Sequence, residues 1–163
     1  MSIKLNDKSY LLASPESKIF PPPDTKISEL PITSLSWVDF ERLCLRLVEE
    51  NHSIDNCEIY GVSGSKQDGI DIFASKDSNK YECFQCKRYQ TISPGKLDEI
   101  VQKFKSGSWC SKSDKFFLCT SLALNSTGLL DKFNTLKSDL KKDGIDFVKW
   151  DIVQINRILK KHP

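Results

Sequence analysis

Two short strand-like stretches, residues 70–74 and 81–88, flank a turn-forming run at residues 77–79. Branched and aromatic side chains dominate both stretches, while the Asp, Ser and Asn between them favour a tight turn. The pattern therefore predicts an antiparallel β-hairpin over residues 70–88. This hairpin constrains the fold more than any other feature of the chain.

Helical and strand patterns alternate through the rest of the sequence. Ser36 is the predicted N-cap of a helix that runs to about Glu50, and Ser93 followed by Pro94 starts a second helix. The other predicted elements are a strand near 58–60, a glycine-rich turn at 61–69, a strand at 116–120, a helix over 129–140 ended by Gly144, a strand at 145–149 and a last helix capped by Asp151. The order α-β-β-β-α-β-α-β-α predicts an α/β fold, with a mixed central sheet flanked by helices.

Proline separates an N-terminal arm from the rest of the chain. Residues 1–34 contain Pro15, the run 21–23 and Pro31, which favour extended chain. We therefore expect an extended arm over residues 1–34 and one domain over residues 35–163. Because Pro163 directly follows a predicted helix, we also expect this domain to be cut from a longer protein.

Charge, apolar content and histidine content exclude several classes of protein. The net charge of +2 over 163 residues excludes a histone-like or polybasic membrane-binding protein. No apolar run approaches the roughly 20 residues that cross a bilayer, and the N-terminus lacks the apolar core of a secretion signal. We therefore expect a cytoplasmic protein without a membrane partner, its six cysteines reduced. With two histidines only, mechanisms that need a His base or a multi-His metal site are disfavoured.

One acidic residue falls within the apolar stripe of the first helix. At 100° per residue, Glu41 lies on the same face as Trp37, Cys44 and Val48. An unpaired buried carboxylate is costly. Glu41 therefore either has a partner such as a cation or lies at the open end of the stripe.

The predicted hairpin carries further polar groups. Asp71 interrupts an apolar strand after Gly69, whereas Asp68 is explained more simply as a turn residue. Alternation places Gln85 and Lys87 on one face of the returning strand. If this strand pairs with residues 70–74, Asp71 lies near both of them. Oxygen ligands of this kind suit Mg²⁺, and a lysine beside the metal can hold or deprotonate an attacking water.

These residues resemble the PD-(D/E)xK nuclease superfamily, in particular its Mrr-like restriction endonuclease branch, in which glutamine replaces the last acidic residue to give QxK. The matching segments are Trp37-x-x-Phe40-Glu41, Gly64-x-x-Gln67-Asp68-Gly69-Ile70-Asp71 and Gln85-Cys86-Lys87-Arg88-Tyr89. The resemblance implies a restriction-endonuclease-like mixed sheet flanked by helices. It implies metal ligation by Asp71, Gln85 and Glu41, a catalytic Lys87, a role for Asp68 that stays open, and Mg²⁺ as cofactor, with Mn²⁺ as the alternative.

The implied substrate is double-stranded DNA. Nine basic residues against five acidic ones lie between positions 76 and 115, so the small net charge hides a basic central segment. Arg88 and Tyr89 are the best candidates for backbone contacts, followed by Ser63, Ser65 and Lys66 in the glycine-rich loop. The sequence has no helix-turn-helix pattern, so we expect little sequence specificity.

Family members of this type often form the N-terminal effector of antiviral defence proteins, fused to C-terminal sensor and ATPase domains and active as a dimer or higher oligomer. Two other hypotheses stay open. The first alternative to a nuclease is a catalytically inactive DNA-binding module of the same fold. The second is a zinc or thiol module that uses Cys83 and Cys86. Because Cys83 and Cys86 point to opposite faces of a continuous strand, the second alternative is the weaker one.

Overall fold

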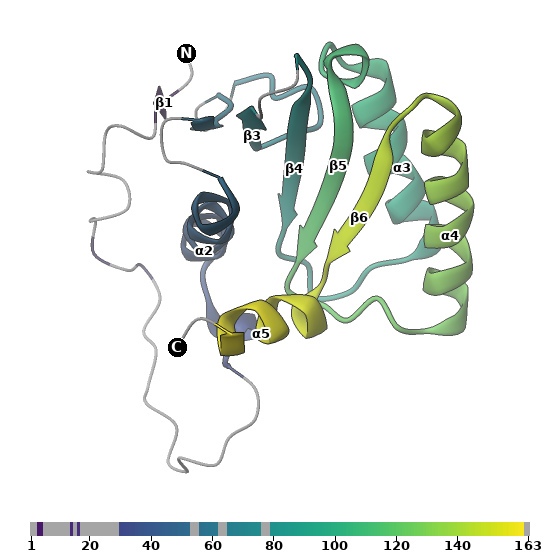
Figure 1. Ribbon diagram of the computed structural model, residues 1–163. Helices are drawn as coiled ribbons and strands as arrows, with labels where there is room; N and C mark the ends of the chain where they lie inside the picture. The colour runs from purple at the N-terminus through teal and green to yellow at the C-terminus, as the bar shows by residue number, and fades with distance from the viewer. Residues whose placement is uncertain are drawn as a thin grey trace.

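A computed structural model gives the arrangement of the chain (Figure 1). It describes residues 3–4, 14, 16, 30–52, 56–61, 65–75 and 79–161. Most of the expected arm, residues 1–34, lies outside the described residues. Within the described part of the arm, Ile32 is buried in the core, in the short 3-10 helix Ile32–Ser34.

Among the described residues, a mixed six-stranded sheet forms the centre of the fold, in the order β1-β2-β3-β4-β5-β6. The first four strands pair antiparallel, and β4-β5 and β5-β6 pair parallel. In each parallel pair a helix joins the two strands, as a crossover connection requires. The predicted α/β class and mixed sheet are confirmed. The strands are β1 Ile3–Lys4, β2 Cys57–Ile59, β3 Ile72–Ser75, β4 Tyr81–Lys87, β5 Ser113–Thr120 and β6 Asp146–Trp150.

The helices cover both faces of this sheet. Figure 1 shows α3 and α4 together on one side of the sheet and α2 on the other side. Helix α5 lies below the lower ends of the strands in this view. The sheet therefore has one core under α2 and α5 and a second core under α3 and α4. The helices are α2 Trp37–Asn51, α3 Pro94–Ser106, α4 Thr127–Lys142 and α5 Ile152–Lys161.

The predicted helix starts are confirmed by their caps. The Ser36 side chain accepts a hydrogen bond from the Asp39 backbone amide at 3.1 Å, and Asp151 accepts from that of Gln154 at 3.1 Å. Ser93 accepts from the Lys96 amide at 3.1 Å, with Pro94 as the first helical residue. Such caps satisfy amides at the helix ends that have no partner within the helix.

The alternation predicted for β4 holds. Phe84 and Cys86 belong to the core under α2, where Phe84 stacks on Phe117 with ring centroids 4.4 Å apart. Cys83 belongs to the core under α3. One residue of the predicted apolar stripe differs: Trp37 is 40% exposed, because it is the first residue of α2 and the buried part of the helix begins two residues later.

Candidate active site

Asp71 directly precedes β3, and backbone hydrogen bonds on both sides hold it. Its amide donates to the Phe84 carbonyl at 2.8 Å, and its carbonyl accepts from the Tyr60 amide at 2.8 Å. The turn before it lies directly on α3. At Gly69, where φ is +81°, an added Cβ would come within 2.9 Å of the Phe104 backbone nitrogen. Only glycine therefore fits this approach, which fixes the position of Asp71 two residues later.

The Asp71 carboxylate is 1% exposed, and its two oxygens have different surroundings. Oδ2 accepts a hydrogen bond from the Cys86 backbone amide at 2.7 Å and another from the Gln85 side-chain amide. Oδ1 is buried and has no hydrogen-bond partner among the described residues. A buried acceptor without a partner is costly. A cation bound there would remove that cost.

Burial raises the pKa of Asp71 above its ordinary value. The hydrogen bond from the Cys86 amide, the positive charge of Lys87 and the hydrogen bond from Gln85 oppose this effect, but desolvation is the largest contribution. The ionised carboxylate is thus held in an environment that disfavours its charge. A bound metal ion would reverse that balance.

Gln85 and Lys87 project from the same face of β4, as the alternation predicted. Gln85 is buried, at 3% exposure, and its amide nitrogen is engaged by Asp71. Its carbonyl oxygen is therefore the atom it can offer to a cation. Lys87 is partly exposed, and its charge reaches the Asp71 carboxylate. The structure thus brings three of the predicted residues together at the end of β4.

Two contacts show that α2 runs antiparallel to β4. At one end, His52 Nε2 lies 2.8 Å from Glu82 Oε2. At the other end, the Arg88 guanidinium donates to the Thr33 carbonyl at 3.2 Å, just before the helix. The N-terminal end of α2 therefore lies beside the end of β4 that carries Lys87.

This alignment places Glu41 at the level of the same end. The sulfurs of Cys44 and Cys86 lie within 4.8 Å of each other, so these residues are level along the two elements. Glu41 precedes Cys44 by three residues, about 4.5 Å of helix, which is a little more than one residue of strand. Glu41 is thus level with Lys87, and it is 5% exposed. The carboxylate lies within the buried face of α2, as the sequence predicted.

Asp68 is set apart from this cluster. Its Oδ2 accepts a hydrogen bond from the Ser108 hydroxyl at 3.0 Å, and Lys66 Nζ lies 3.6 Å from its Oδ1. Its φ of +46° places it in the left-handed region, which aspartate tolerates in turns. The structure therefore favours the turn interpretation of Asp68.

The DNA-contact candidates occupy three places. Ser65 and Lys66 line a small pocket with Lys103 and Ser106, while Ser63 lies outside the described residues. Arg88 is anchored at Thr33, as described above. Tyr89 is half-buried, and burial raises the pKa of its hydroxyl, to which the Asp71 charge also contributes. Tyr89 packs against the core under α3.

One basic residue near the site was not predicted. Lys103 lies on the exposed face of α3. Its positive charge opposes the rise in the pKa of Asp71 that burial causes. Nothing in the sequence distinguishes it from the other solvated helix lysines, because its position depends on how the turn before Asp71 packs on α3.

The structure does not bring Cys83 and Cys86 together as a ligand pair. Cys83 faces the core under α3, where its sulfur lies 3.0 Å from the Ser113 hydroxyl, and Cys86 faces α2.

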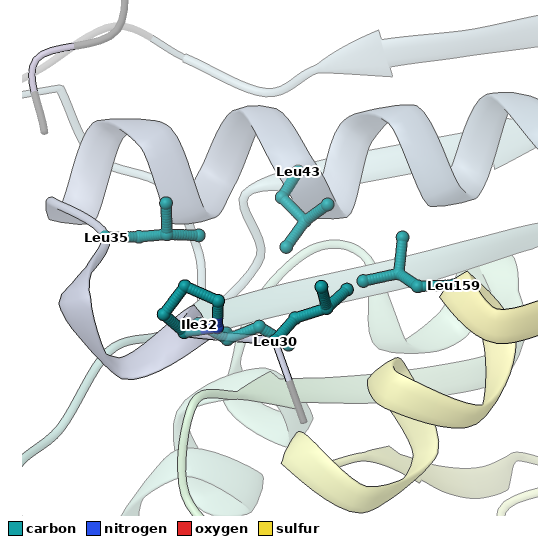
Figure 2. A pocket seen from close by; sticks show the side chains of 6 residues that line it. Leu30, Ile32, Leu35, Leu43 and Leu159 are labelled. Atoms are coloured by element: carbon teal, nitrogen blue, oxygen red, sulfur yellow. The ribbon is translucent and has the colours of Figure 1, made fainter. Parts of the chain in front are cut away.

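A second pocket is apolar and offers no side-chain ligand for a metal ion. Figure 2 shows it lined by apolar side chains between the 3-10 helix, α2 and α5: Leu30, Pro31, Ile32, Leu35, Leu43 and Leu159.

Comparison with known proteins agrees with the geometry. A family model described as restriction endonuclease matches residues 32–126, more than half of the chain. The matched region contains Glu41, Asp71, Gln85 and Lys87. Neither the curated proteins nor the solved structures contain a significant match. Within the described residues, no helix combines the length and apolar character needed to cross a membrane.

Proposed function

The chain belongs to the Mrr-type restriction endonuclease family, and on that premise we propose that it is a metal-dependent endonuclease that hydrolyses phosphodiester bonds of double-stranded DNA with little sequence specificity. The observation that carries the proposal is the buried Asp71 carboxylate, with one oxygen held by two hydrogen bonds and the other without a partner among the described residues. A carboxylate arranged in this way fits a cation ligand better than a structural hydrogen-bond acceptor.

Oxygen donors dominate the proposed metal site. Asp71 Oδ1 and the Gln85 carbonyl oxygen would bind the ion, and Glu41 would complete the set from α2. Hard oxygen ligands select Mg²⁺, with Mn²⁺ as the alternative. When bound, such an ion offsets the negative charge that builds up on a scissile phosphate. Because one ligand is a neutral amide, we expect weaker metal binding than a second carboxylate would give.

Lys87 is the proposed catalytic residue. Its ammonium group is close enough to act electrostatically on Asp71, and it follows Gln85 on the same face of β4. From this position it would orient an attacking water, accept its proton or stabilise charge on the phosphate. This assignment uses no histidine, in keeping with the position of His52 at the opposite end of β4.

Substrate contacts would surround this cluster. Tyr89 follows Lys87 by two residues, and Lys66 and Lys103 line one pocket beside the turn before β3. Basic and hydroxyl groups at such positions bind phosphates without reading base sequence. We therefore propose that these residues and Arg88 hold the DNA backbone, which accounts for low sequence specificity.

One Asp71–Lys87 cluster per domain cleaves one strand at a time. A double-strand break therefore needs two domains on one duplex, and we propose a dimer or higher oligomer as the active form. By analogy with its family, the domain would be the cytoplasmic effector of a bacterial anti-phage defence protein, clustered by fused C-terminal sensor and ATPase domains.

Cleavage of supercoiled plasmid tests the proposal. The chain is incubated with plasmid and with linear duplex in Mg²⁺, in Mn²⁺ and in EDTA. We expect nicked and then linear products that need the metal and appear on unrelated sequences. DNA binding without cleavage in any metal would support a catalytically inactive DNA-binding module instead.

A further inference from the structure

Three cysteines from three different elements meet in the core under α2. The sulfurs of Cys44 on α2, Cys86 on β4 and Cys119 on β5 all lie within 4.8 Å of one another, and each residue is fully buried. All three are free thiols. Cys86 and Cys119 are partners in the parallel register of β4 and β5, and Cys44 lies over both of them from the helix.

The spacing of the three sulfurs fits a shared ion. A metal–sulfur bond is about 2.3 Å long. Three sulfurs around one ion in a plane are therefore about 4 Å apart, within the observed limit of 4.8 Å. Small rotations of the three side chains would place an ion between them. A disulfide needs two sulfurs about 2 Å apart and leaves the third thiol without a role.

The type and number of donors restrict the ion. Sulfur ligands select soft ions such as Cu⁺ and Zn²⁺ over Mg²⁺ or Ca²⁺. Among the described residues, no fourth histidine, cysteine or carboxylate joins this group of ligand atoms. Structural Zn²⁺ sites have four protein ligands, and zinc sites with three protein ligands keep a fourth position open to water or substrate. The three cysteines here are fully buried, which leaves no such position open to solvent. Three sulfur ligands therefore favour Cu⁺.

From this geometry we propose that Cys44, Cys86 and Cys119 form a binding site for one Cu⁺ ion, separate from the oxygen site at Asp71. Each thiol that becomes a ligand releases one proton to solvent, so that three thiolates around one Cu⁺ release three protons and leave a net charge of −2 at the site. The ion keeps its oxidation state, and no further reactant is required.

The two sites share one strand but use different side chains and different ligand atoms. The Cys86 side chain points toward α2, whereas its backbone amide holds Asp71 on the other site. Hard and soft ions would thus be sorted by ligand chemistry within one stretch of β4. The proposal does not rest on nuclease activity, so its test uses no DNA.

Titration of the full chain with Cu⁺, under reducing and oxygen-free conditions against a competing Cu⁺ chelator, tests the site. We expect one Cu⁺ per chain by native mass spectrometry, together with ultraviolet charge-transfer absorbance from sulfur to copper. The variants C86S and C119S should lose this stoichiometric binding. C57S, which removes a buried thiol outside the cluster, and C110S, which removes a half-buried one, should retain it.

Thermal unfolding of the unsubstituted chain provides a measurement that does not depend on the folding of a variant. One equivalent of Cu⁺ should raise the Tm, because an ion that binds the folded state stabilises it. Absence of a copper-bound species and of a Tm shift would overturn the proposal. So would equal loss of binding in C57S and C86S, or preferential binding of Zn²⁺.

Discussion

The Gln85 side-chain amide donates a hydrogen bond to Oδ2 of Asp71, so that the neutral residue of the QxK motif binds the carboxylate beside it. A glutamate at this position would place a second negative charge against a buried one. The glutamine therefore stabilises the metal-free site, while its carbonyl oxygen is still available as a ligand. Under the proposed function, this arrangement lets a neutral residue take a position at which the superfamily pattern has an acid.

The variant Q85E should show this trade-off directly. In EDTA, two adjacent buried carboxylates repel each other, and loss of the amide donor removes a charge-assisted hydrogen bond worth about 1.5–3 kcal/mol. We expect a lower Tm than that of the unsubstituted chain in EDTA, and a larger gain in Tm on addition of Mg²⁺. Thermal unfolding with and without the metal checks this. An unchanged Tm in EDTA would show that the Gln85–Asp71 bond contributes nothing to stability.

Two glycine substitutions separate backbone strain from displacement of the site. Both Gly69 and Gly144 have positive φ, at +81° and +76°, but only Gly69 faces backbone atoms that a Cβ would strike. G144A should cost about 1–2 kcal/mol of stability and leave cleavage intact. G69A should cost more and also impair cleavage, because Asp71 follows two residues later. Urea unfolding and plasmid cleavage measure both effects; equal behaviour of the two variants would contradict the account.

Glu41 can be tested against another acid of the same helix. E41Q removes a buried charge at the level of Lys87, whereas E50Q removes an exposed one near the opposite end of α2. We expect E41Q to raise the Mg²⁺ concentration needed for half-maximal cleavage, and E50Q to leave it unchanged. If E41Q requires no more Mg²⁺ than the unsubstituted chain, Glu41 does not contribute to the metal site.

The raised pKa of Asp71 predicts how pH acts on the metal-free protein. Because the folded state holds the Asp71 proton more tightly than the unfolded state does, stability falls as pH rises from the ordinary aspartate value of 3.8 through the raised value. D71N removes this contribution, so its stability should fall less than that of the unsubstituted chain over the same interval. Urea unfolding in EDTA at several pH values gives the comparison. Parallel pH profiles would indicate that Asp71 is not buried as described.

Protonation of Asp71 should also compete with the metal. As pH falls toward the raised pKa, the apparent affinity for Mg²⁺ should decrease at a higher pH than an ordinary aspartate would allow. Calorimetric titration with Mg²⁺ at several pH values measures this directly. A metal affinity that stays constant down to the ordinary aspartate range would contradict a protonatable buried ligand.

Local signals in the sequence were sufficient to predict most of the fold. Ser36, Ser93 and Asp151 cap the helices as expected, and the hairpin positions Asp71 beside Gln85. The exposure of Trp37 was not predictable, because helical periodicity does not show where along a helix the packing begins.

Groupings that depend on tertiary packing could not be read from the sequence. Lys103 approaches Asp71 only through the packing of a turn on α3. The cysteines at 44, 86 and 119 are far apart in the sequence and meet where a helix crosses two parallel strands. The sequence drew attention to Cys83 and Cys86, two neighbours on one strand that face different cores.

The most direct test of the central claim is plasmid cleavage by K87A in saturating Mg²⁺, with K141A, an exposed lysine of α4, as the matched control. Loss of a positioned proton-transfer group typically costs about 10²–10⁴-fold in rate. We expect a loss of this size for K87A and normal cleavage by K141A. Equal cleavage rates for K87A and the unsubstituted chain would contradict it.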